Sequence, residues 1–362
     1  MNNMLIYDTT LRDGEQMPGV VFSRGEKIEL AKKFDDFGVD IIGLMPAVSE
    51  GERKVAEDLV DYGLRDKLIA ATMMRKDHID LAYDLGMKNI ILFSSVSDIH
   101  LKKKLNISRE ENLNKAVRYI NYAKEKGGRV FFAGEDSSRA DFSYLVNFMN
   151  TLDVGYFLVC DTLGVLTPFQ TYNWIKNLKK ETDCKIGLHV HNDFGCATAN
   201  SLAGMEAGAD LVSGTFTGIG ERAGNACLEE ILVSLKCQYD VDLGVRYDLL
   251  GEICDLVQEY SGIELQKHKA IVGKNAFSHE SGIHVDGVLK YSKNYEVIDP
   301  EFVGREREII FGKHLGMAGL RYLFEGKFSE EKCREILFGI KELSQKEKRI
   351  FSENEVLKIF GD

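Results

Sequence analysis

The feature of this sequence that most restricts its fold is a regular alternation of short apolar runs with longer amphipathic segments. The runs resemble buried strands and lie at 5–8, 41–45, 68–73, 89–95, 130–135, 156–161, 186–191 and 211–216. The segments between them carry apolar residues at helical spacing, and several close on glycine, as helix C-termini often do. Eight strand-then-helix units predict an α/β fold, a (β/α)₈ TIM barrel.

Polar side chains follow the predicted strands where each strand ends. They are Asp8, Arg12, Asp13, Glu135, Asp136, Asp161, Thr162, His189, His191, Thr215 and Thr217. Active sites of (β/α)₈ barrels lie at this end, because the loops that leave the strands meet there. A doubly wound open sheet would also explain the alternation, but its crevice would not draw polar groups from nearly every strand. We therefore expect a barrel with a polar site at its C-terminal end.

The alternation stops after about residue 265, which predicts two domains. We expect a TIM-barrel catalytic domain over 1–265 and a small, α-rich C-terminal appendage over 266–362. In the appendage, a Gly-rich, His-containing stretch at 273–290 precedes two predicted amphipathic helices, 317–325 and 329–360. We expect these helices to pack on the barrel rim or on a partner subunit.

Charge and cysteine content exclude several classes of protein. The 362 residues carry a formal net charge of -11, which argues against binding to the phosphate backbone of a nucleic acid. The seven cysteines are scattered and never form a CxxC pair, which fits a reducing, cytoplasmic location. The start of the chain lacks the pattern of a signal peptide, and no apolar run approaches the roughly 18–20 residues of a membrane helix. We expect no membrane partner.

Two histidines and an aspartate suggest a metal site. His189 and His191 alternate with Val190 in a predicted strand, so both imidazoles point to the same face. A single strand histidine is more often structural, but Asp13 at another strand end supplies the carboxylate of a two-histidine, one-carboxylate site. These nitrogen and oxygen ligands suit Mn²⁺, Mg²⁺, Co²⁺ or Zn²⁺ alike.

Arg12 adjoins Asp13 in a loop of small and flexible residues. A guanidinium beside a metal site would bind a carboxylate through two hydrogen bonds or stabilise a developing alkoxide. The alternative is a barrel-end salt bridge from Arg12 to Glu135 or Asp161. A Gly-rich loop at 214–226 is a less specific pattern, whose backbone N–H groups would suit a phosphate-bearing cofactor.

These patterns occur within motifs that resemble a known enzyme family over essentially the whole chain. The motifs are DTTLRDGEQ (8–16), SDIHLKKKL (97–105), GEDSSRAD (134–141), CDTLGVLTP (160–168), LHVHND (188–193), GIGERAGNA (218–226), NAFSHESGIHVDG (275–287) and GKHLG (312–316). In these motifs the sequence is similar to the homocitrate, isopropylmalate and citramalate synthases, which are more distantly related to hydroxymethylglutaryl-CoA lyase.

The resemblance implies an acyltransferase that joins the acetyl group of acetyl-CoA to a 2-oxo acid by a metal-assisted Claisen condensation, followed by thioester hydrolysis. It implies that Asp13, His189 and His191 bind a divalent metal ion, with Asn225 near the same ion. Arg12 resembles the arginine that holds the 2-oxo acid and acts in catalysis.

The resemblance also implies roles for three more residues. Thr162 resembles the threonine that binds the 2-oxo acid's carboxylate. Glu135 and His284 resemble the acid–base pair, in which the histidine comes from the appendage of the neighbouring subunit. A homodimer is therefore expected.

The motifs GEDSSRAD and SHESGIHVDG are most similar to those of short homocitrate synthases associated with nitrogenase cofactor assembly. This resemblance implies 2-oxoglutarate as the substrate. Citramalate formation from pyruvate, Re-type citrate formation from oxaloacetate and isopropylmalate formation remain alternatives. A chain ending at Asp362 is expected to lack a C-terminal regulatory domain. An acyl-CoA lyase would lack the appendage, and a catalytically idle paralogue would be expected to have lost at least one of the site residues.

The sequence departs from the family pattern at several positions, two of which lie in the second strand and in the GKHLG motif. Gly43 stands in the second strand where the family usually has a glutamate, and Leu315 replaces the serine of GKHSG. Three histidines, His78, His100 and His268, have no partner that the sequence suggests, and we expect them to be surface or supporting residues.

Overall fold

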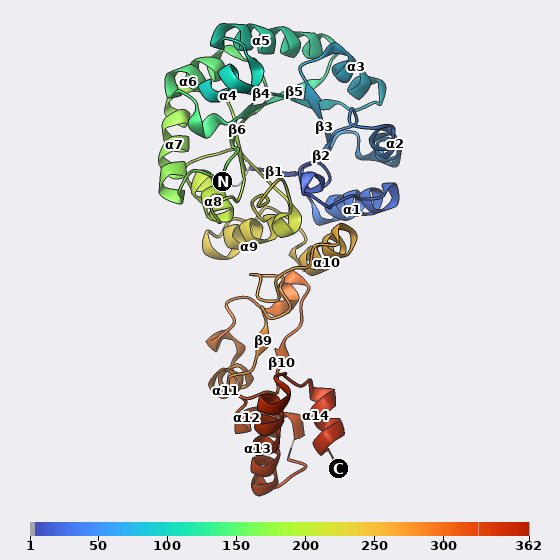
Figure 1. The fold of residues 1–362 in the computed structure, drawn as a ribbon, viewed down its shortest axis with the longest axis vertical. Coiled ribbons are helices and arrows are strands. Elements are labelled where there is room, and N and C mark those ends of the chain that lie inside the picture. The colour runs from blue at the N-terminus through green and yellow to red at the C-terminus, as the bar shows by residue number, and fades with distance from the viewer. Residues whose placement is uncertain (1–3, 325, 362) are drawn as a thin grey trace. The chain divides into compact units, whose positions relative to one another are not determined.

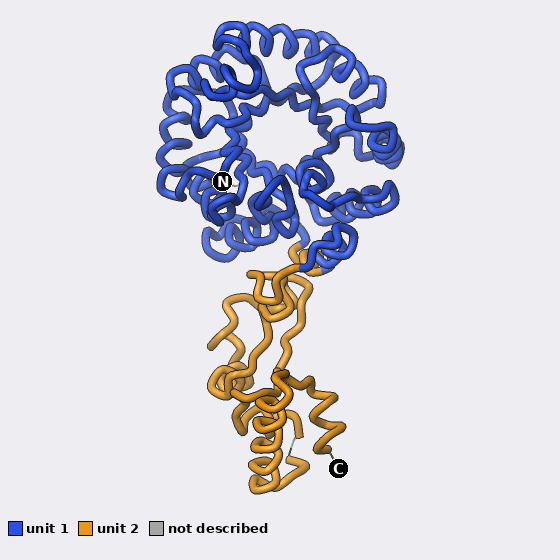
Figure 2. The backbone as a smooth tube through the Cα atoms, in the orientation of Figure 1, with its two compact units in different colours: residues 1–246, 252–264 blue, residues 247–251, 265–362 orange. Residues whose placement is uncertain are grey.

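The computed structural model describes residues 4–324 and 326–361, so residue 325 of the predicted helix 317–325 lies outside the described residues. The chain forms two compact units, which Figure 2 shows in different colours. The first unit comprises residues 1–246 and 252–264, and the second comprises residues 247–251 and 265–362. No helix of the described residues is long and apolar enough to cross a membrane.

The first unit is a closed, parallel, eight-stranded barrel, which confirms the predicted TIM barrel. Its strands are β1 (Leu5–Asp8), β2 (Ile41–Leu44), β3 (Leu68–Met73), β4 (Asn89–Ser95), β5 (Arg129–Glu135), β6 (Phe157–Asp161), β7 (Ile186–Val190) and β8 (Leu211–Gly214). Each strand pairs with the next along the chain, and β1 closes the barrel by pairing with β8.

Helices surround the strands of the barrel (Figure 1). They are α1 (Arg24–Phe37), α2 (Glu50–Leu59), α3 (Lys76–Asp84), α4 (Asp98–His100), α5 (Arg109–Glu125), α6 (Phe142–Thr151), α7 (Pro168–Glu181), α8 (Ala197–Glu206), α9 (Leu228–Gln238) and α10 (Leu250–Ser261). Ser23, Ser108 and Thr167 begin α1, α5 and α7 with reciprocal capping boxes, which satisfy backbone N–H groups that a helix start leaves unpaired.

Alternate strand residues point into the barrel, because successive side chains of a strand face opposite sides. They form an apolar cluster of Tyr7, Ile41, Ile69, Ala71, Ile91, Phe131, Tyr156, Leu158, Cys160 and Leu211. At the C-terminal ends of β5 and β7, the side chains that point inward are polar: Glu135, His189 and, just after β7, His191. The apolar cluster therefore fills the barrel interior next to the polar side chains at the C-terminal ends of the strands.

A buried lysine fixes the loop after β1. Lys27, on α1, is fully buried, and its ammonium group donates to the Leu11 carbonyl and to the carboxylates of Glu15 and Glu52. Two of these acceptors lie in the loop that carries Arg12 and Asp13. Because a buried ammonium group needs its partners, this cluster holds the loop in one position.

Asp8 links the end of β1 to the segment that follows β8, from a fully buried position. Its carboxylate accepts hydrogen bonds from the Thr10 N–H (3.1 Å) and the Thr10 hydroxyl (2.7 Å), and the same hydroxyl accepts from the Phe216 N–H. Burial raises the pKa of Asp8 to about 7, from 3.8 in the unfolded chain. A raised pKa favours folding at low pH, and this contribution is lost as the pH rises through about 7.

We therefore expect Asp8→Asn to change how stability depends on pH. The variant lacks the ionisation penalty, so its unfolding free energy relative to the wild type should rise by about 3 kcal/mol between about pH 5 and pH 8. Urea unfolding of both proteins across this range measures the difference. A difference that stays constant with pH would mean that Asp8 ionises in the folded protein as it does in the unfolded chain.

The second unit pairs two short parallel strands, β9 (Ser278–His279) and β10 (Glu308–Ile309). Its helices are α11 (Gly282–Lys290), α12 (Met317–Phe324), α13 (Glu330–Glu347) and α14 (Glu353–Phe360), which pack around a core that includes Phe311, Leu320, Ile340 and Phe351. The prediction of one helix over 329–360 was wrong. Lys348 adopts a left-handed conformation that ends α13, and Ser352 with Glu355 forms a capping box that begins α14.

Candidate active site

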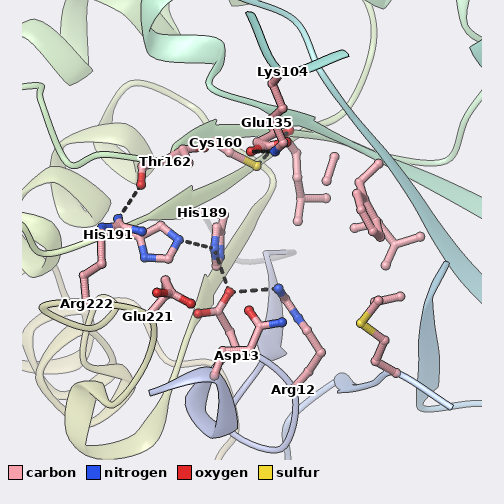
Figure 3. Close-up of a pocket in the computed structure, with 17 residues that line it drawn as sticks. Arg12, Asp13, Lys104, Glu135, Cys160, Thr162, His189, His191, Glu221 and Arg222 are labelled. Carbon is pink, nitrogen blue, oxygen red and sulfur yellow. Dashed lines mark hydrogen bonds and ion pairs between the residues drawn. The ribbon is translucent and has the colours of Figure 1, made fainter. Parts of the chain in front are cut away.

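A cavity of about 310 Å³ opens at the C-terminal ends of the barrel strands. Six of the predicted site residues line it: Arg12, Asp13, Glu135, Thr162, His189 and His191 (Figure 3). Asn225 lies behind this wall, and its side-chain amide donates to Asp13 Oδ1 at 2.9 Å. The barrel thus brings together side chains from the loops or ends of β1, β5, β6, β7 and β8.

Asp13, His189 and His191 form the most compact group in the cavity. The Nε2 atoms of the two imidazoles lie 3.2 Å apart, and Nε2 of His189 lies 3.5 Å from Asp13 Oδ2. Nδ1 of His189 lies 3.0 Å from the Ser213 hydroxyl, which fixes the orientation of that ring. All three side chains are buried.

The charges of this group suit a cation. Burial raises the pKa of Asp13, but Arg12 and His189 outweigh burial and hold the pKa well below 3.8. Burial, together with the neighbouring His189, lowers the pKa of His191 to about 4. At neutral pH, Asp13 is therefore an anion and His191 a neutral imidazole, and both are in the form that binds metal ions.

The residues present fit a divalent metal ion. The ligand atoms of Asp13, His189 and His191 all lie within 4.8 Å of one another, which allows one ion to contact all three. Nδ1 of His191 and Oδ1 of Asn225 are buried and have no hydrogen-bond partner among the described residues. Two imidazoles, a carboxylate and an unpaired amide oxygen form the mixed donor set that such ions take in proteins.

Arg12 makes its ion pair with its neighbour in the chain. Its Nη1 donates to Asp13 Oδ2 at 2.8 Å. Burial lowers the pKa of the guanidinium, but the negative charge of Asp13 and of other neighbours raises it, and the net effect is a rise. No ion pair joins Arg12 to Glu135 or Asp161 among the described residues, so the alternative of a salt bridge to either was wrong. Asp161 instead accepts from Ser138 and from backbone N–H groups of its own loop.

Glu135 lies at the end of β5 among polar partners that the sequence did not reveal. Both its carboxylate oxygens accept from Lys104, at 2.5 and 2.8 Å, and one accepts from the Ser95 hydroxyl at 2.6 Å. His100 Nδ1 lies 3.6 Å from Glu135, so His100 supports the site and is not an isolated surface histidine. Lys104 and His100 both belong to the SDIHLKKKL motif, which is the signal that could have pointed to them.

Thr162 is held from two directions. Its hydroxyl oxygen accepts from the Asp136 N–H at 2.8 Å, and its carbonyl accepts from Arg222 at 2.6 Å. Arg222 also forms two hydrogen bonds to Asp193, each of 2.8 Å. The hydroxyl proton of Thr162 stays available to an anion in the cavity, because its oxygen is used as the acceptor.

The Gly-rich loop 214–226 contributes side chains to the cavity. The N–H groups of Gly218, Gly224, Asn225 and Ala226 bond within the loop or to β7. Glu221 and Arg222 line the cavity, and neither was predicted as a site residue. The loop therefore offers a ligand at least these two side chains.

His284 belongs to the second unit, where it lies exposed on α11. Its ring stacks on Tyr295, with centroids 4.1 Å apart and an interplanar angle of 22°. The next residue, Glu296, is buried and binds both His279 (3.0 Å) and Arg307 (2.7 Å). This pair of contacts fixes the segment that carries Tyr295.

Sequence comparisons match most of the first unit and part of the second unit to known protein families. Residues 3–257 match the HMGL-like family, and residues 271–348 match the homocitrate synthase post-HMGL domain-like family. Homocitrate synthase AksA of Methanopyrus kandleri is 41% identical over 356 residues, which cover 96% of this chain and 90% of that protein. The 2-isopropylmalate synthase of Sulfolobus acidocaldarius is 44% identical, over 96% of this chain and 92% of that protein.

Solved structures match the barrel. The HMG-CoA lyase of Bacillus subtilis superimposes with a TM-score of 0.65 at 21% sequence identity, and the match covers 74% of this chain and 97% of the lyase. At this identity the likeness shows the fold. It agrees with the closed barrel of the first unit.

Proposed function

Because this chain belongs to the HMGL-like family, in the group of acetyl-CoA-condensing 2-oxo acid synthases, we propose that it condenses acetyl-CoA with 2-oxoglutarate to give homocitrate and CoA. The observation that carries the proposal is the composition of the cavity. The possible metal ligands Asp13, His189 and His191 line it. The guanidinium of Arg12 and the carboxylate of Glu135 line the same cavity. Homocitrate synthases are among the similar proteins, as are isopropylmalate synthases.

Asp13, His189 and His191, with Asn225 beside them, are the residues that would hold a divalent ion such as Mn²⁺, Mg²⁺, Co²⁺ or Zn²⁺. When bound, such an ion supplies Lewis-acid polarisation of a ketone oxygen. Arg12 binds the carboxylate of the 2-oxo acid and stabilises the alkoxide that forms on addition. Thr162 donates its hydroxyl proton to the same carboxylate.

Glu135 and His284 move the protons in the proposed reaction. A base must remove a proton from the acetyl methyl group while the resulting enolate carbon attacks the ketone carbon. We assign this task to His284 with Glu135, whose carboxylate Lys104 and Ser95 hold in place. Water activated by His284 then cleaves the thioester, which releases CoA and makes the overall step effectively irreversible.

The proposed substrate has two carboxylates, and the cavity has a cation for the second one. Lys104 lines the cavity, and its side chain is 52% exposed. Its ammonium group has three donors, so it can hold Glu135 and a second anion together. We assign the distal carboxylate of 2-oxoglutarate to Lys104.

One observation favours a different 2-oxo acid. Part of the cavity wall is apolar and consists of Met45, Ala71, Ile91, Phe93, Ala133 and Leu158. Such a wall suits the isopropyl group of 2-oxoisovalerate, which would make the protein an isopropylmalate synthase. Pyruvate and oxaloacetate are smaller alternatives for the same space.

We further infer that the protein works as a homodimer in which the appendage of one subunit, residues 266–362, supplies His284 to the barrel domain, residues 1–265, of the other. Support comes from the resemblance of SHESGIHVDG to synthases built in this way. The exposure of His284 on α11 is compatible with this role.

Release of free CoA tests the proposal. Metal-loaded protein is given acetyl-CoA with 2-oxoglutarate, oxaloacetate, pyruvate or 2-oxoisovalerate, and the free thiol is followed with a thiol reagent. We expect kcat/KM for 2-oxoglutarate to exceed that for pyruvate and for 2-oxoisovalerate, which lack a second carboxylate, by about tenfold or more, the effect of one well-placed ion pair. A preference for oxaloacetate would transfer the assignment to citrate synthesis. A preference for 2-oxoisovalerate would transfer the assignment to isopropylmalate synthesis. If no CoA were released with any of the four acids, the proposal would be contradicted.

A further inference from the structure

Arg222, in the loop after β8, joins three loops at the C-terminal end of the barrel. Its Nε and Nη2 donate to the two carboxylate oxygens of Asp193, each at 2.8 Å, and Asp193 lies in the loop after β7. The same Nη2 donates to the carbonyl of Thr162, in the loop after β6, at 2.6 Å (Figure 3). A planar guanidinium makes this fork in one orientation only, so the three loops are held in a fixed relation.

Thr162 is bonded on both sides by residues with a left-handed backbone. The φ of Arg222 is 57°, in a region that few residues other than glycine adopt. Asp136, whose N–H donates to the Thr162 hydroxyl, has a φ of 62° and is itself held by Arg139 through two hydrogen bonds of 2.8 Å. Backbone strain of this kind gathers where a functional group must be held in position.

The group of possible metal ligands is held without Arg222, whereas Thr162 is not. Asn225 donates through its backbone N–H to the Gly218 carbonyl at 3.0 Å and through its side-chain amide to Asp13 at 2.9 Å. Among the described residues, Arg222 is the only hydrogen-bond donor to the Thr162 carbonyl. A change at Arg222 should therefore move Thr162 more than it moves the ligand group.

We propose that Arg222 is a positioning residue for Thr162, which it holds by the carbonyl so that the Thr162 hydroxyl faces the carboxylate beside the ketone of the bound 2-oxo acid. Since the hydroxyl oxygen accepts from Asp136, its proton is left for this carboxylate. The inference rests on the proposed function, because it takes Thr162 to bind a 2-oxo acid. All four acids named above have a carboxylate beside the ketone, so the inference holds for any of them.

Arg222→Ala tests the inference. The probe is 2-oxoglutarate, or whichever of the four acids the wild type prefers, and its Kd is measured by calorimetry on Mn²⁺-loaded protein. We expect the Kd to rise about tenfold, roughly the effect of losing one hydrogen bond with a charged group, and KM for the acid to rise with it. KM for acetyl-CoA and the Kd of Mn²⁺ should stay within about twofold. A Kd of Mn²⁺ that rose as much as that of the acid would reveal general damage to the site and overturn the inference.

Thr162→Val separates positioning from direct contact, because it removes the hydroxyl and keeps the branched shape of the side chain. If Arg222 acts through this hydroxyl, then adding Arg222→Ala to Thr162→Val should raise the Kd of the acid by no more than about twofold further. A further tenfold rise would show that Arg222 binds the acid itself, and the positioning role would be wrong.

Arg75→Ala is the matched control. Arg75 lies in the loop after β3 and forms the same kind of fork with Asp77, at 3.0 and 2.6 Å, but it does not line the cavity. We expect it to change none of these quantities. Should Arg222→Ala fail to fold, Arg222→Lys, which keeps the charge but not the fork, takes its place with the same expected rise.

Two failures are distinguishable. An unchanged Kd of the acid in the Arg222 variant would overturn the inference while leaving the proposed function in place. A wild-type protein that neither binds nor turns over any of the four 2-oxo acids would overturn both.

Discussion

Asp13→Ala is expected to lower kcat/KM for CoA release by about 10³-fold or more, since metal catalysis of this kind contributes several kcal/mol. The substitution removes the only carboxylate of the predicted ligand set and the ion-pair partner of Arg12. Metal affinity should fall with activity. Metal content after gel filtration and Mn²⁺ titration by calorimetry measure this second effect without relying on turnover.

Asp77→Ala is the matched control for Asp13→Ala. Asp77 also pairs with a nearby arginine, Arg75, through two hydrogen bonds, but on the exposed surface of the barrel. We expect this control to keep both metal and activity, because exposed ion pairs contribute little. If Asp13→Ala bound Mn²⁺ as tightly as the wild type, Asp13 would not be a ligand.

His284→Ala is expected to abolish condensation, with a loss of about 10³-fold in kcat, while metal content stays unchanged. The reason is that an acetyl methyl group is a weak acid, and a positioned base typically contributes 10²- to 10⁴-fold. The control is His268→Ala, which removes another exposed histidine of the second unit. Near-normal turnover by His284→Ala would show that the base is a different residue.

Mixing two inactive variants tests whether His284 acts across subunits. After subunit exchange, Asp13→Ala and His284→Ala proteins should regain part of the wild-type activity, because some dimers then contain one barrel with Asp13 facing one appendage with His284. Each variant exchanged with itself is the control. No recovery, in dimers shown by mass to have exchanged, would place His284 in the site of its own chain.

The sequence predicted the parts of the structure that depend on local periodicity. The alternation of His189 and His191 places both rings on one face of β7, and the barrel topology brings the loop after β1 beside them. Asp13 therefore reaches the histidines as predicted, and the cavity includes Glu135 and Thr162 from two further strands.

The remainder depends on contacts that periodicity does not encode. Lys104 reaches Glu135 from a π-helical turn between α4 and α5, a geometry that no residue spacing indicates. Gly43 is a second example. A Cβ atom at this position would lie 3.0 Å from Cε2 and the hydroxyl oxygen of Tyr7, a close approach that the sequence does not indicate. By contrast, the start of α14 did have a local signal, Ser352 with Glu355 three residues later, within a polar stretch that otherwise reads as continuous helix.

The proposed function requires that the cavity lined by Asp13, His189, His191 and Arg12 forms a carbon–carbon bond. The most direct measurement is ¹³C NMR of the products formed from acetyl-CoA labelled at the methyl carbon, with 2-oxoglutarate and metal-loaded protein. We predict that the label moves from the methyl group of the thioester to a methylene carbon beside a tertiary alcohol, with one CoA released per product. Label that remains in acetyl-CoA, or that appears only in free acetate, would contradict the claim.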